Sequence, residues 1–286
     1  MLPSLQVGPY TVIALADGEG PFFSARSEAF PDATGEQWAA VDAFDPGALD
    51  ADGRWWLQFR AFAIRSERGV TLVDAGIGPA DGPAAAWAPV PGALPASLAA
   101  AGIEPSDVDT VVLTHLHTDH VGWAVVGGAQ ARPFFPNAEY LLQQAELDAI
   151  EALNPQLRAS VIDPLRGTDQ LRLLRGGTPL RGGERVLATP GHTPGHQSVL
   201  VESRRERVAV TGDLLVHAIQ LLHPGLAYAH EVDPAQARAS RERLLLDGES
   251  ADTLHLATPH LTEPFVDGRP GTEAVRKDVS GSGSAG

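Results

Sequence analysis

Metal-binding side chains are concentrated where an apolar strand is expected to end. The run 111–114, VVLT, is followed directly by the hexapeptide HLHTDH, which begins at His115. In an extended or tightly turned segment, His115 and His117 point the same way because side chains two positions apart share a face. Asp119 and His120 follow at once. One metal ion seldom needs four ligands from so short a stretch, so the segment predicts two neighbouring metal ions.

Three further candidate ligands each follow a strand-like run of their own. The runs 185–190 and 207–210, and a run that begins near Thr253, are followed by His192, Asp213 and His260. Open α/β sheets bind ligands at the carboxyl edge of their strands, where loops converge on a rigid sheet. We therefore expect these side chains to meet at one edge. The repeated order of ligand after strand favours a metal site over isolated structural histidines.

With these motifs the chain resembles the metallo-β-lactamase-fold hydrolase superfamily. The similar segments run from LVDAG at residues 72–76 to the PH dipeptide that ends at His260. The resemblance implies an α/β fold of the αββα type, in which two mixed β-sheets with flanking helices form a single domain over residues 1–271. It also implies a dinuclear site. The first metal would be held by His115, His117 and His192, the second by Asp119, His120 and His260, and Asp213 would bridge the two.

This ligand set indicates metal-assisted hydrolysis. Imidazole and carboxylate ligands suit zinc, and manganese, iron or cobalt are alternatives for such a site. Two divalent ions about 3.5–4 Å apart can share a water and lower its pKa towards neutrality. We expect a metal-bridging hydroxide to attack the substrate directly, with Asp119 and Asp213 as the catalytic carboxylates. No cysteine or obvious serine nucleophile points to a covalent intermediate instead.

The charge and the amino-acid composition exclude several classes of binding partner and of metal site. The net charge of −15 and the pI near 5.0 disfavour nucleic acid and anionic membranes as partners. The absence of cysteine excludes disulfides and any β-lactamase ligand set that uses a metal-binding cysteine, since Asp213 stands in its place. No apolar run approaches the roughly 18 residues of a membrane span, and the first ten residues do not resemble a secretory signal. We expect a cytoplasmic protein that acts on a small molecule. The sequence is compatible with a homodimer as well as with a monomer.

Periodicity and turn signals predict the main elements. Strands are expected over residues 7–16, 57–65 and 69–73, with the first strand broken at 17–21. Helices are expected over residues 94–101, 138–153 and 234–246, the last with Asp233 as N-cap and Pro234 at its first position. Residues 79–95 are expected to form a flexible crossover. The glycine- and serine-rich end, within residues 272–286, predicts a flexible tail.

Several residues are expected to support the site. Asp74 ends the strand 69–73, and a metal-bound histidine usually donates its second N–H to such a carboxylate. A turn-forming role before Ala75–Gly76 is the alternative. His196 is expected to orient the GHTPGH loop or to make a plain structural hydrogen bond. The substrate pocket is expected to draw on aromatic residues and on the segment after the bridging aspartate, namely Phe22, Phe23, Trp123, His217, Gln220 and Leu221.

The resemblance leaves the substrate open. Lactonases of this fold often carry a tyrosine three residues after the bridging aspartate, where this chain has Val216, with His217 as a candidate substitute. We expect a lactone or an activated ester as substrate. The alternative is a phosphotriester, as in the branch typified by methyl parathion hydrolase. Thioester hydrolysis of the glyoxalase II kind is disfavoured because few residues follow His260 and the chain has one lysine. A non-catalytic metal-binding protein is the remaining alternative.

Overall fold

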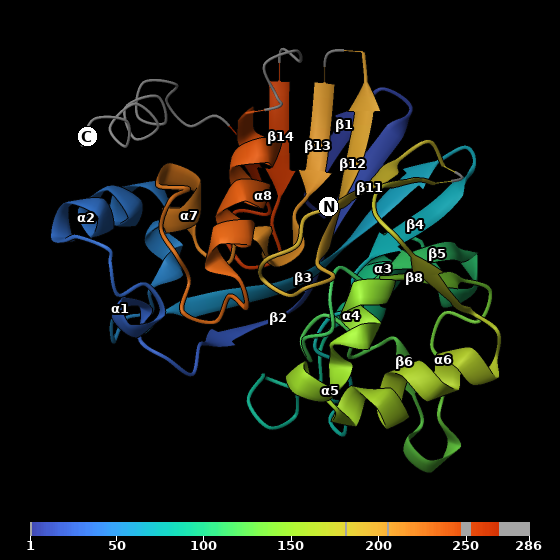
Figure 1. The fold of residues 1–286 in the computed structure, drawn as a ribbon. Coiled ribbons are helices and arrows are strands. Elements are labelled where there is room, and N and C mark those ends of the chain that lie inside the picture. Colours follow the sequence, from blue (N-terminus) through green and yellow to red (C-terminus); the bar gives the residue numbers. More distant parts are fainter. Residues whose placement is uncertain (1, 181, 205, 247–252, 269–286) are drawn as a thin grey trace.

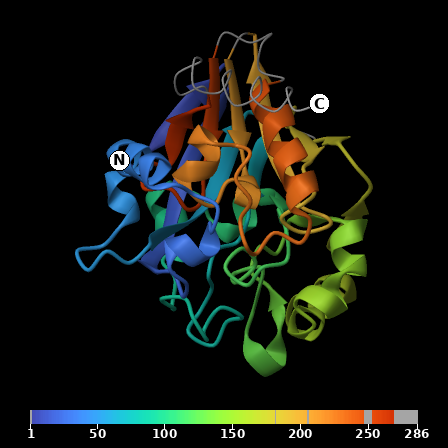
Figure 2. The same cartoon turned by 60° about the vertical axis from the view of Figure 1, so that its left-hand side comes forward.

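Two β-sheets pack face to face, and helices cover their outer faces (Figures 1 and 2). The computed structural model describes residues 2–180, 182–204, 206–246 and 253–268. The fold predicted from the sequence, a mixed α/β sandwich with flanking helices, is therefore confirmed. The tail predicted over residues 272–286 lies outside the described residues. Within those residues, no helix is long and apolar enough to cross a membrane.

The first sheet has seven strands and mixes both kinds of pairing. In spatial order it contains β1 (Ser4–Val7), β2 (Tyr10–Pro21), β3 (Trp56–Ser66), β4 (Gly69–Val73), β5 (Val108–Val112), β8 (Glu139–Gln143) and β9 (Leu171–Leu174). The strands β1 to β4 pair antiparallel. The strands β4, β5, β8 and β9 pair parallel, so their carboxyl ends meet at one edge.

The second sheet has six strands. In spatial order it contains β10 (Thr178–Pro179), β11 (Arg185–Ala188), β12 (Gln197–Ser203), β13 (Glu206–Val210), β14 (Thr253–Ala257) and β15 (Phe265–Asp267). Only β13 and β14 pair parallel among these described strands. A small separate hairpin joins β6 (Val125–Val126) to β7 (Arg132–Pro133).

The helices fall into three groups. One group covers the seven-stranded sheet and contains α3 (Leu94–Ala100), α4 (Gln144–Asp148), α5 (Ile150–Leu153) and α6 (Asp163–Gly167). The helix α8 (Pro234–Leu246) covers the six-stranded sheet. The remaining helices are α1 (Arg26–Ala29), α2 (Gly35–Phe44) and α7 (Ala218–Leu222). Figures 1 and 2 show α1 and α2, in blue, on the opposite side of the molecule from α4 to α6, in green.

Alternate residues of the strands supply different layers of the core. In β3, Phe62 lies between the two sheets and packs in one cluster with Val201 of β12. Its neighbour Ala63 lies on the other face, in the cluster that includes Leu98 of α3. Leu244 of α8 belongs to a third cluster on the outer face of the six-stranded sheet. This period of two is what a strand buried on both faces requires.

Two predicted helices are confirmed and one is wrong in part. The helix predicted over 94–101 is α3. The helix predicted over 234–246 is α8, and the Asp233 carboxylate accepts a hydrogen bond from the backbone N–H of Gln236 at 3.0 Å. The helix predicted over 138–153 begins instead as the strand β8 and becomes helical only from Gln144. Leu141 and Leu142 serve the two opposite faces of the sheet. In a strand buried on both faces, apolar and polar residues do not alternate along the sequence. Its continuous apolar run is therefore hard to distinguish from a buried helix.

The break predicted at residues 17–21 is also wrong. The strand β2 continues to Pro21, with an irregularity in its pairing between Ala16 and Gly18. Asp17 at this bulge is buried, and its carboxylate accepts hydrogen bonds from the backbone N–H of Ile77 and of Leu94 at 2.5 and 2.6 Å. A bulge re-aims a side chain without ending the strand. The buried carboxylate thus fastens β2 to the loops beyond β4.

Candidate metal centre

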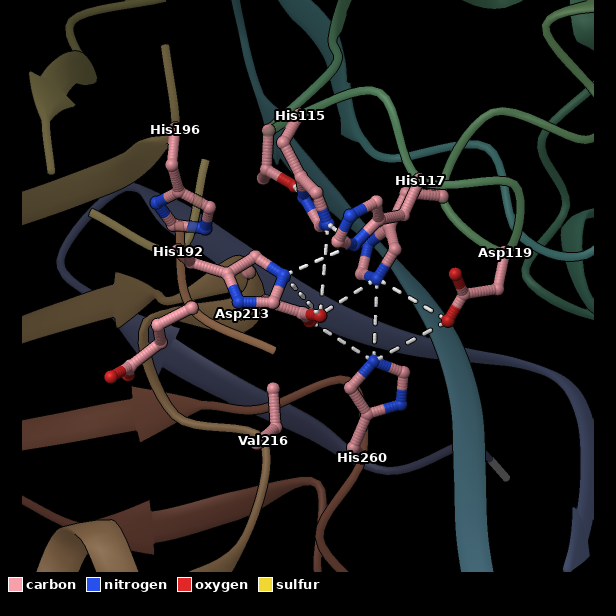
Figure 3. A network of polar contacts seen from close by, with 12 residues as sticks. His115, His117, Asp119, His192, His196, Asp213, Val216 and His260 are labelled. Atoms are coloured by element: carbon pink, nitrogen blue, oxygen red, sulfur yellow. Dashed lines mark hydrogen bonds and ion pairs between the residues drawn. The ribbon is translucent and has the colours of Figure 1, made fainter. Parts of the chain in front are cut away.

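The candidate ligands gather at one edge of the sandwich. His115, His117, Asp119 and His120 follow β5, His192 lies between β11 and β12, Asp213 follows β13, and His260 follows β14. Figure 3 shows His115, His117, Asp119, His192, Asp213 and His260 turned toward a common centre. Their ligand atoms form two groups, each with all members within 4.8 Å of one another: His115, His117, His192 and Asp213, and Asp119, His120 and His260.

Asp213 lies between the two groups and turns one carboxylate oxygen to each. Its Oδ2 lies 3.6 Å from Nε2 of His115 and 3.2 Å from Nε2 of His192. Its Oδ1 lies 3.1 Å from Nε2 of His120 and 3.0 Å from Nε2 of His260. This arrangement would allow the carboxylate to bridge two metal ions, the role that the resemblance implies for Asp213.

A glycine lets Asp213 reach this position. Gly212 has φ of +53°, in the left-handed region that glycine adopts without strain. A Cβ at Gly212 would lie 2.8 Å from Nε2 of His196 and from Cβ of Thr114. The chain can therefore turn sharply at the end of β13, close against both neighbours, only because residue 212 has no side chain.

The ring nitrogens within each group face one another. Nδ1 of His117 lies 2.9 Å from Nε2 of His115 and 3.1 Å from Nε2 of His192. Nε2 of His120 lies 3.3 Å from Nε2 of His260. Burial and the neighbouring histidines hold the pKa of His115 and of His117 well below the usual range. Both rings therefore stay neutral, which metal ligation requires, so the donor set fits metal ions.

Asp119 belongs to the second group. Its Oδ2 lies 3.5 Å from Nε2 of His120 and 3.7 Å from Nε2 of His260. Burial raises the pKa of Asp119, against the opposing charges of the two histidines. The same burial lowers the pKa of His120, but the charges of Asp213, Asp119 and Asp74 outweigh it and raise that pKa well above its usual value. Three carboxylates thus surround His120 with negative charge, which bound cations would balance.

Asp74 makes the contact predicted for it. Its Oδ2 lies 2.8 Å from Nδ1 of His120, and its two oxygens also accept hydrogen bonds from the backbone N–H and the hydroxyl of Thr114 at 2.7 and 2.9 Å. Asp74 has φ of +63°, a left-handed conformation that aspartate tolerates better than most residues. The His260 ring is also held on the side away from the centre, because its Nδ1 lies 2.8 Å from the carbonyl oxygen of Gln58.

His196 lies beside the candidate metal centre and makes structural hydrogen bonds to Thr189. Its Nδ1 lies 3.0 Å from the carbonyl oxygen of Thr189 and 2.9 Å from the hydroxyl of the same residue. Its ring centroid is 5.3 Å from that of His115. Burial and the neighbouring His192 lower the pKa of His196 to about 3. His196 therefore ties the GHTPGH loop to the end of β11 as a neutral ring.

Glu146 supports the centre and was missed in the sequence. Its Oε1 accepts a hydrogen bond from the backbone N–H of Leu116, and its Oε2 accepts one from the backbone N–H of Gly195, both at 2.9 Å. Glu146 is fully buried, and burial raises its pKa while these hydrogen bonds oppose the rise. It joins the HLHTDH loop to the GHTPGH loop. The available signal was an acidic residue just after β8, which the helix predicted over 138–153 concealed.

Replacing Glu146 with alanine is expected to lower the free energy of unfolding of the metal-free protein by about 2–6 kcal/mol. The change leaves two buried N–H groups without acceptors, at about 1–3 kcal/mol each. Urea unfolding in the presence of chelator measures the loss. Glu151→Ala is the control, since Glu151 is exposed and pairs with Arg158 at the surface, where such pairs contribute less than about 1 kcal/mol. Equal losses in the two variants would show that Glu146 does not join the loops.

A cavity of about 350 Å³ opens onto the two groups of ligands. Its floor includes His117, Asp119, His192, Asp213 and His260. Its apolar wall includes Phe22, Phe23, Trp55, Trp87, Val216 and Tyr228. The predicted pocket residues Phe22 and Phe23 thus line it, and Phe23 is 65% exposed at the rim. Among the described residues that line the cavity there is no lysine or arginine.

Four predicted pocket residues are placed elsewhere. Trp123 packs against the core beneath the helices and donates its indole N–H to Asp17 at 3.1 Å. Leu221 is buried in the core under α8. Gln220 is fully buried, and its amide oxygen accepts a hydrogen bond from the backbone N–H of Val216 at 2.9 Å. These predictions are wrong because closeness in sequence to the ligands does not fix which way a helix or loop turns its side chains.

His217 is the fourth, and it caps α7 inside an aromatic cluster. Its Nδ1 accepts a hydrogen bond from the backbone N–H of Ile219 at 3.1 Å. Its ring centroid lies 5.2 Å from that of Trp55 and 5.5 Å from that of Trp38. Burial, followed by the charge of Arg26, lowers the pKa of His217 to about 3. His217 therefore does not take the position of the lactonase tyrosine in the cavity.

The buried His217 is expected to make the protein less stable in acid. The unfolded chain binds a proton at this residue below about pH 6.5, whereas the folded chain excludes it down to about pH 3. The stabilising contribution is present above pH 6.5 and is lost as pH falls, by up to about 1.4 kcal/mol per pH unit. His217→Asn keeps an acceptor for Ile219 but does not titrate. The measurement is urea unfolding of both metal-free proteins between about pH 6 and pH 4, where the wild-type curve should fall more steeply; parallel curves would refute this assignment.

Comparison with known sequences gives one family match and several partial matches. The model of the metallo-beta-lactamase superfamily matches residues 55–251. An N-acyl homoserine lactonase of Bacillus sp is 34% identical over 104 residues, which are 36% of this chain and 37% of that protein. The N-acyl homoserine lactonase AttM of Rhizobium radiobacter is 35% identical over 117 residues, 36% of this chain and 39% of that protein. The chain therefore matches little more than a third of the length of these curated relatives.

Solved structures are similar over most of the chain. The structure of the hydrolase AbOPH, of the beta lactamase superfamily, has a TM-score of 0.73 and 25% identity, with 92% of this chain and 91% of that one covered. AidC, a dizinc quorum-quenching lactonase, has a TM-score of 0.71 and 21% identity, with 93% and 92% covered. The second likeness shows the fold alone. Together with the family match over more than half of the sequence, these findings show that the chain belongs to the metallo-beta-lactamase superfamily.

Proposed function

We propose that this protein is a metal-dependent hydrolase that opens lactones or cleaves activated esters at a dinuclear centre. The observation that carries the proposal is the position of Asp213, with one carboxylate oxygen turned to each of two buried groups of ligands. A purely structural aspartate has no reason to face four histidine nitrogens in a cavity. The family match and the partial likeness to N-acyl homoserine lactonases support the same reading.

The residues fit a pair of divalent ions, for which zinc is the first candidate. His115, His117 and His192 would hold one ion, Asp119, His120 and His260 the other, and Asp213 both. When bound, the ions would supply an activated water and an electrophile for the substrate oxygen. Asp74 orients the His120 ring from behind through its contact with Nδ1.

The cavity favours uncharged, partly apolar substrates. Its wall is aromatic and aliphatic, and the described residues that line it offer no cationic side chain to a substrate carboxylate. A carboxylate buried without a partner is costly, so β-lactams should be poor substrates. A lactone with an apolar substituent is both uncharged and partly apolar. Phosphotriesters are the second candidate, because the same aromatic wall also suits an uncharged aryl phosphotriester.

A kinetic panel tests the proposal. Protein loaded with zinc is assayed with an acyl-homoserine lactone, an aryl ester, paraoxon, a glutathione thioester and a cephalosporin. We expect the highest kcat/KM for the lactone or the aryl ester, loss of that activity with a chelator, and its return with added zinc. An Asp213→Ala preparation made in parallel detects contaminating esterases.

The other outcomes discriminate the alternatives. The highest kcat/KM with paraoxon would favour the second candidate, and with the thioester a glyoxalase II-like activity. Efficient turnover of the cephalosporin alone would show that the cavity does not select uncharged, partly apolar substrates. Bound zinc without turnover of any substrate would favour a non-catalytic metal-binding protein and defeat the proposal.

A further inference from the structure

Tyr228 lies on the cavity wall beside the candidate metal centre. It belongs to the segment between α7 and α8, and it is 5% exposed. Its ring is nearly parallel to that of His192, with an angle of 13° and centroids 6.0 Å apart. It lines the same cavity as Asp119 and Asp213. The residue therefore borders the space where a substrate would meet the centre.

The hydroxyl of Tyr228 has no partner in the described part of the protein, unlike those of the other two tyrosines. The hydroxyl of Tyr140 donates to the carbonyl oxygen of Ala124 at 3.0 Å and accepts from the backbone N–H of Phe135 at 3.2 Å. The hydroxyl of Tyr10 donates to the carbonyl oxygen of Gly182 at 3.0 Å. Polar groups buried in proteins are nearly always hydrogen-bonded. The Tyr228 hydroxyl is not sealed in the core but borders the open cavity, so a molecule that enters the cavity can supply its partner.

We propose that the Tyr228 hydroxyl donates a hydrogen bond to an oxygen of the bound substrate and so fixes its position over the metal centre. The proposal deepens the hydrolase function proposed above and rests on it. A phenol carries its proton at neutral pH, so the hydroxyl acts as a donor. The acceptor on a lactone or ester is the carbonyl or the ring oxygen. By contrast, the indole N–H of Trp87 on the same wall is already bonded to the hydroxyl of Thr118 at 3.0 Å.

A buried ion pair holds Tyr228 in place from behind. Oε2 of Glu231 accepts a hydrogen bond from the backbone N–H of Tyr228 at 3.2 Å. Oε1 of Glu231 accepts from the guanidinium of Arg241, which is fully buried, and from the side-chain amide of Gln220 at 3.1 Å. Gln220 in turn holds the backbone of Val216. Glu231, Arg241 and Gln220 thus fix two residues of the cavity wall together and act as positioning residues.

Tyr228→Phe in the zinc-loaded protein tests the proposal, with Tyr10→Phe as the matched control outside the cavity. Phenylalanine keeps the ring beside His192 and removes only the hydroxyl. We expect kcat/KM for the best lactone or ester to fall about tenfold to a hundredfold. Binding of the γ-lactam analogue of that substrate, measured by calorimetry, should weaken at least about fivefold. Metal content and the thermal midpoint should match those of the wild type, and Tyr10→Phe should keep full activity.

Each result decides one proposal. If the wild type hydrolyses the lactone or ester and Tyr228→Phe stays within twofold in both turnover and analogue binding, the role of Tyr228 is refuted and the hydrolase function stands. A fall in activity that comes with lost zinc, and with unchanged binding of the analogue by the zinc-replete variant, would likewise refute a contact with substrate. If the zinc-loaded wild type turns over no lactone or ester, the proposed function itself fails, and the role of Tyr228 fails with it.

Discussion

Replacing Asp213 with alanine is expected to lower kcat/KM for the best lactone or ester by more than about a thousandfold. The physical reason is that one side chain serves both groups of ligands, with 3.0 Å to Nε2 of His260 on one side and 3.2 Å to Nε2 of His192 on the other. In the proposed dinuclear centre, its loss would remove a ligand from both ions and the negative charge between the two groups of ligands. The measurement pairs steady-state kinetics with elemental analysis of the same sample, in which zinc content should fall as well.

Asp52→Ala is the matched control, since the Asp52 side chain is 80% exposed and pairs with Arg54 at the surface. It should keep both activity and zinc. An Asp213→Ala protein with activity and zinc content near those of the wild type would show that the order of the ligands is wrong. Loss of activity with both ions retained would show that Asp213 is needed for the chemical step and not for metal binding.

Wild-type protein freed of excess metal is expected to hold two zinc ions per chain, and His260→Ala about one. His260 contributes to the group with Asp119 and His120 only, whereas His115, His117 and His192 keep their own contacts with Asp213. Chelation should abolish activity, and His260→Ala should lower it by at least about a hundredfold, because the activated water and the electrophile both depend on the pair of ions. Inductively coupled plasma analysis after desalting gives the stoichiometry.

His255→Ala provides the control, since His255 lies within β14 five residues before His260 and belongs to neither group of ligands. It should bind two ions and remain active. A firm value of one ion per chain in fully active wild-type protein would contradict the dinuclear proposal. Equal loss of both ions from His260→Ala would instead show that the two sites fold and fill as a unit.

Local patterns in the sequence determined the strand ends and the residue types placed there. A strand fixes the direction of alternate side chains, so the run before His115 already predicted where ligands would be presented. The same reasoning placed Asp74 at the end of β4, where its carboxylate meets Nδ1 of His120. These strand ends depend on neighbours within a few residues, which is why they can be read without the structure. The two-sheet sandwich was implied by the resemblance of the motifs to those of the metallo-β-lactamase superfamily.

The wrong predictions of secondary structure fall in buried segments whose contacts come from distant parts of the chain. In β8, Leu141 and Leu142 are both buried, one in each core, so the strand lacked the alternation that distinguishes it from a helix. That error hid Glu146, whose carboxylate joins two loops that are far apart in sequence. The run DGEGP at residues 17–21 predicts a break for a related reason, because the groups that satisfy the Asp17 carboxylate come from segments distant in sequence.

Only the tertiary structure decided which side chains share the cavity. The sequence by itself determined the candidate ligands and the strand-like runs that precede them, because these follow from short-range spacing, and the resemblance of its motifs to a known superfamily implied the class of fold. It did not show that Asp213 turns one oxygen to each group, that Trp123 and His217 face the core, or that Tyr228 lies against His192. Those facts depend on how separate loops pack when the two sheets close on each other, and short-range spacing carries no record of contacts between distant segments.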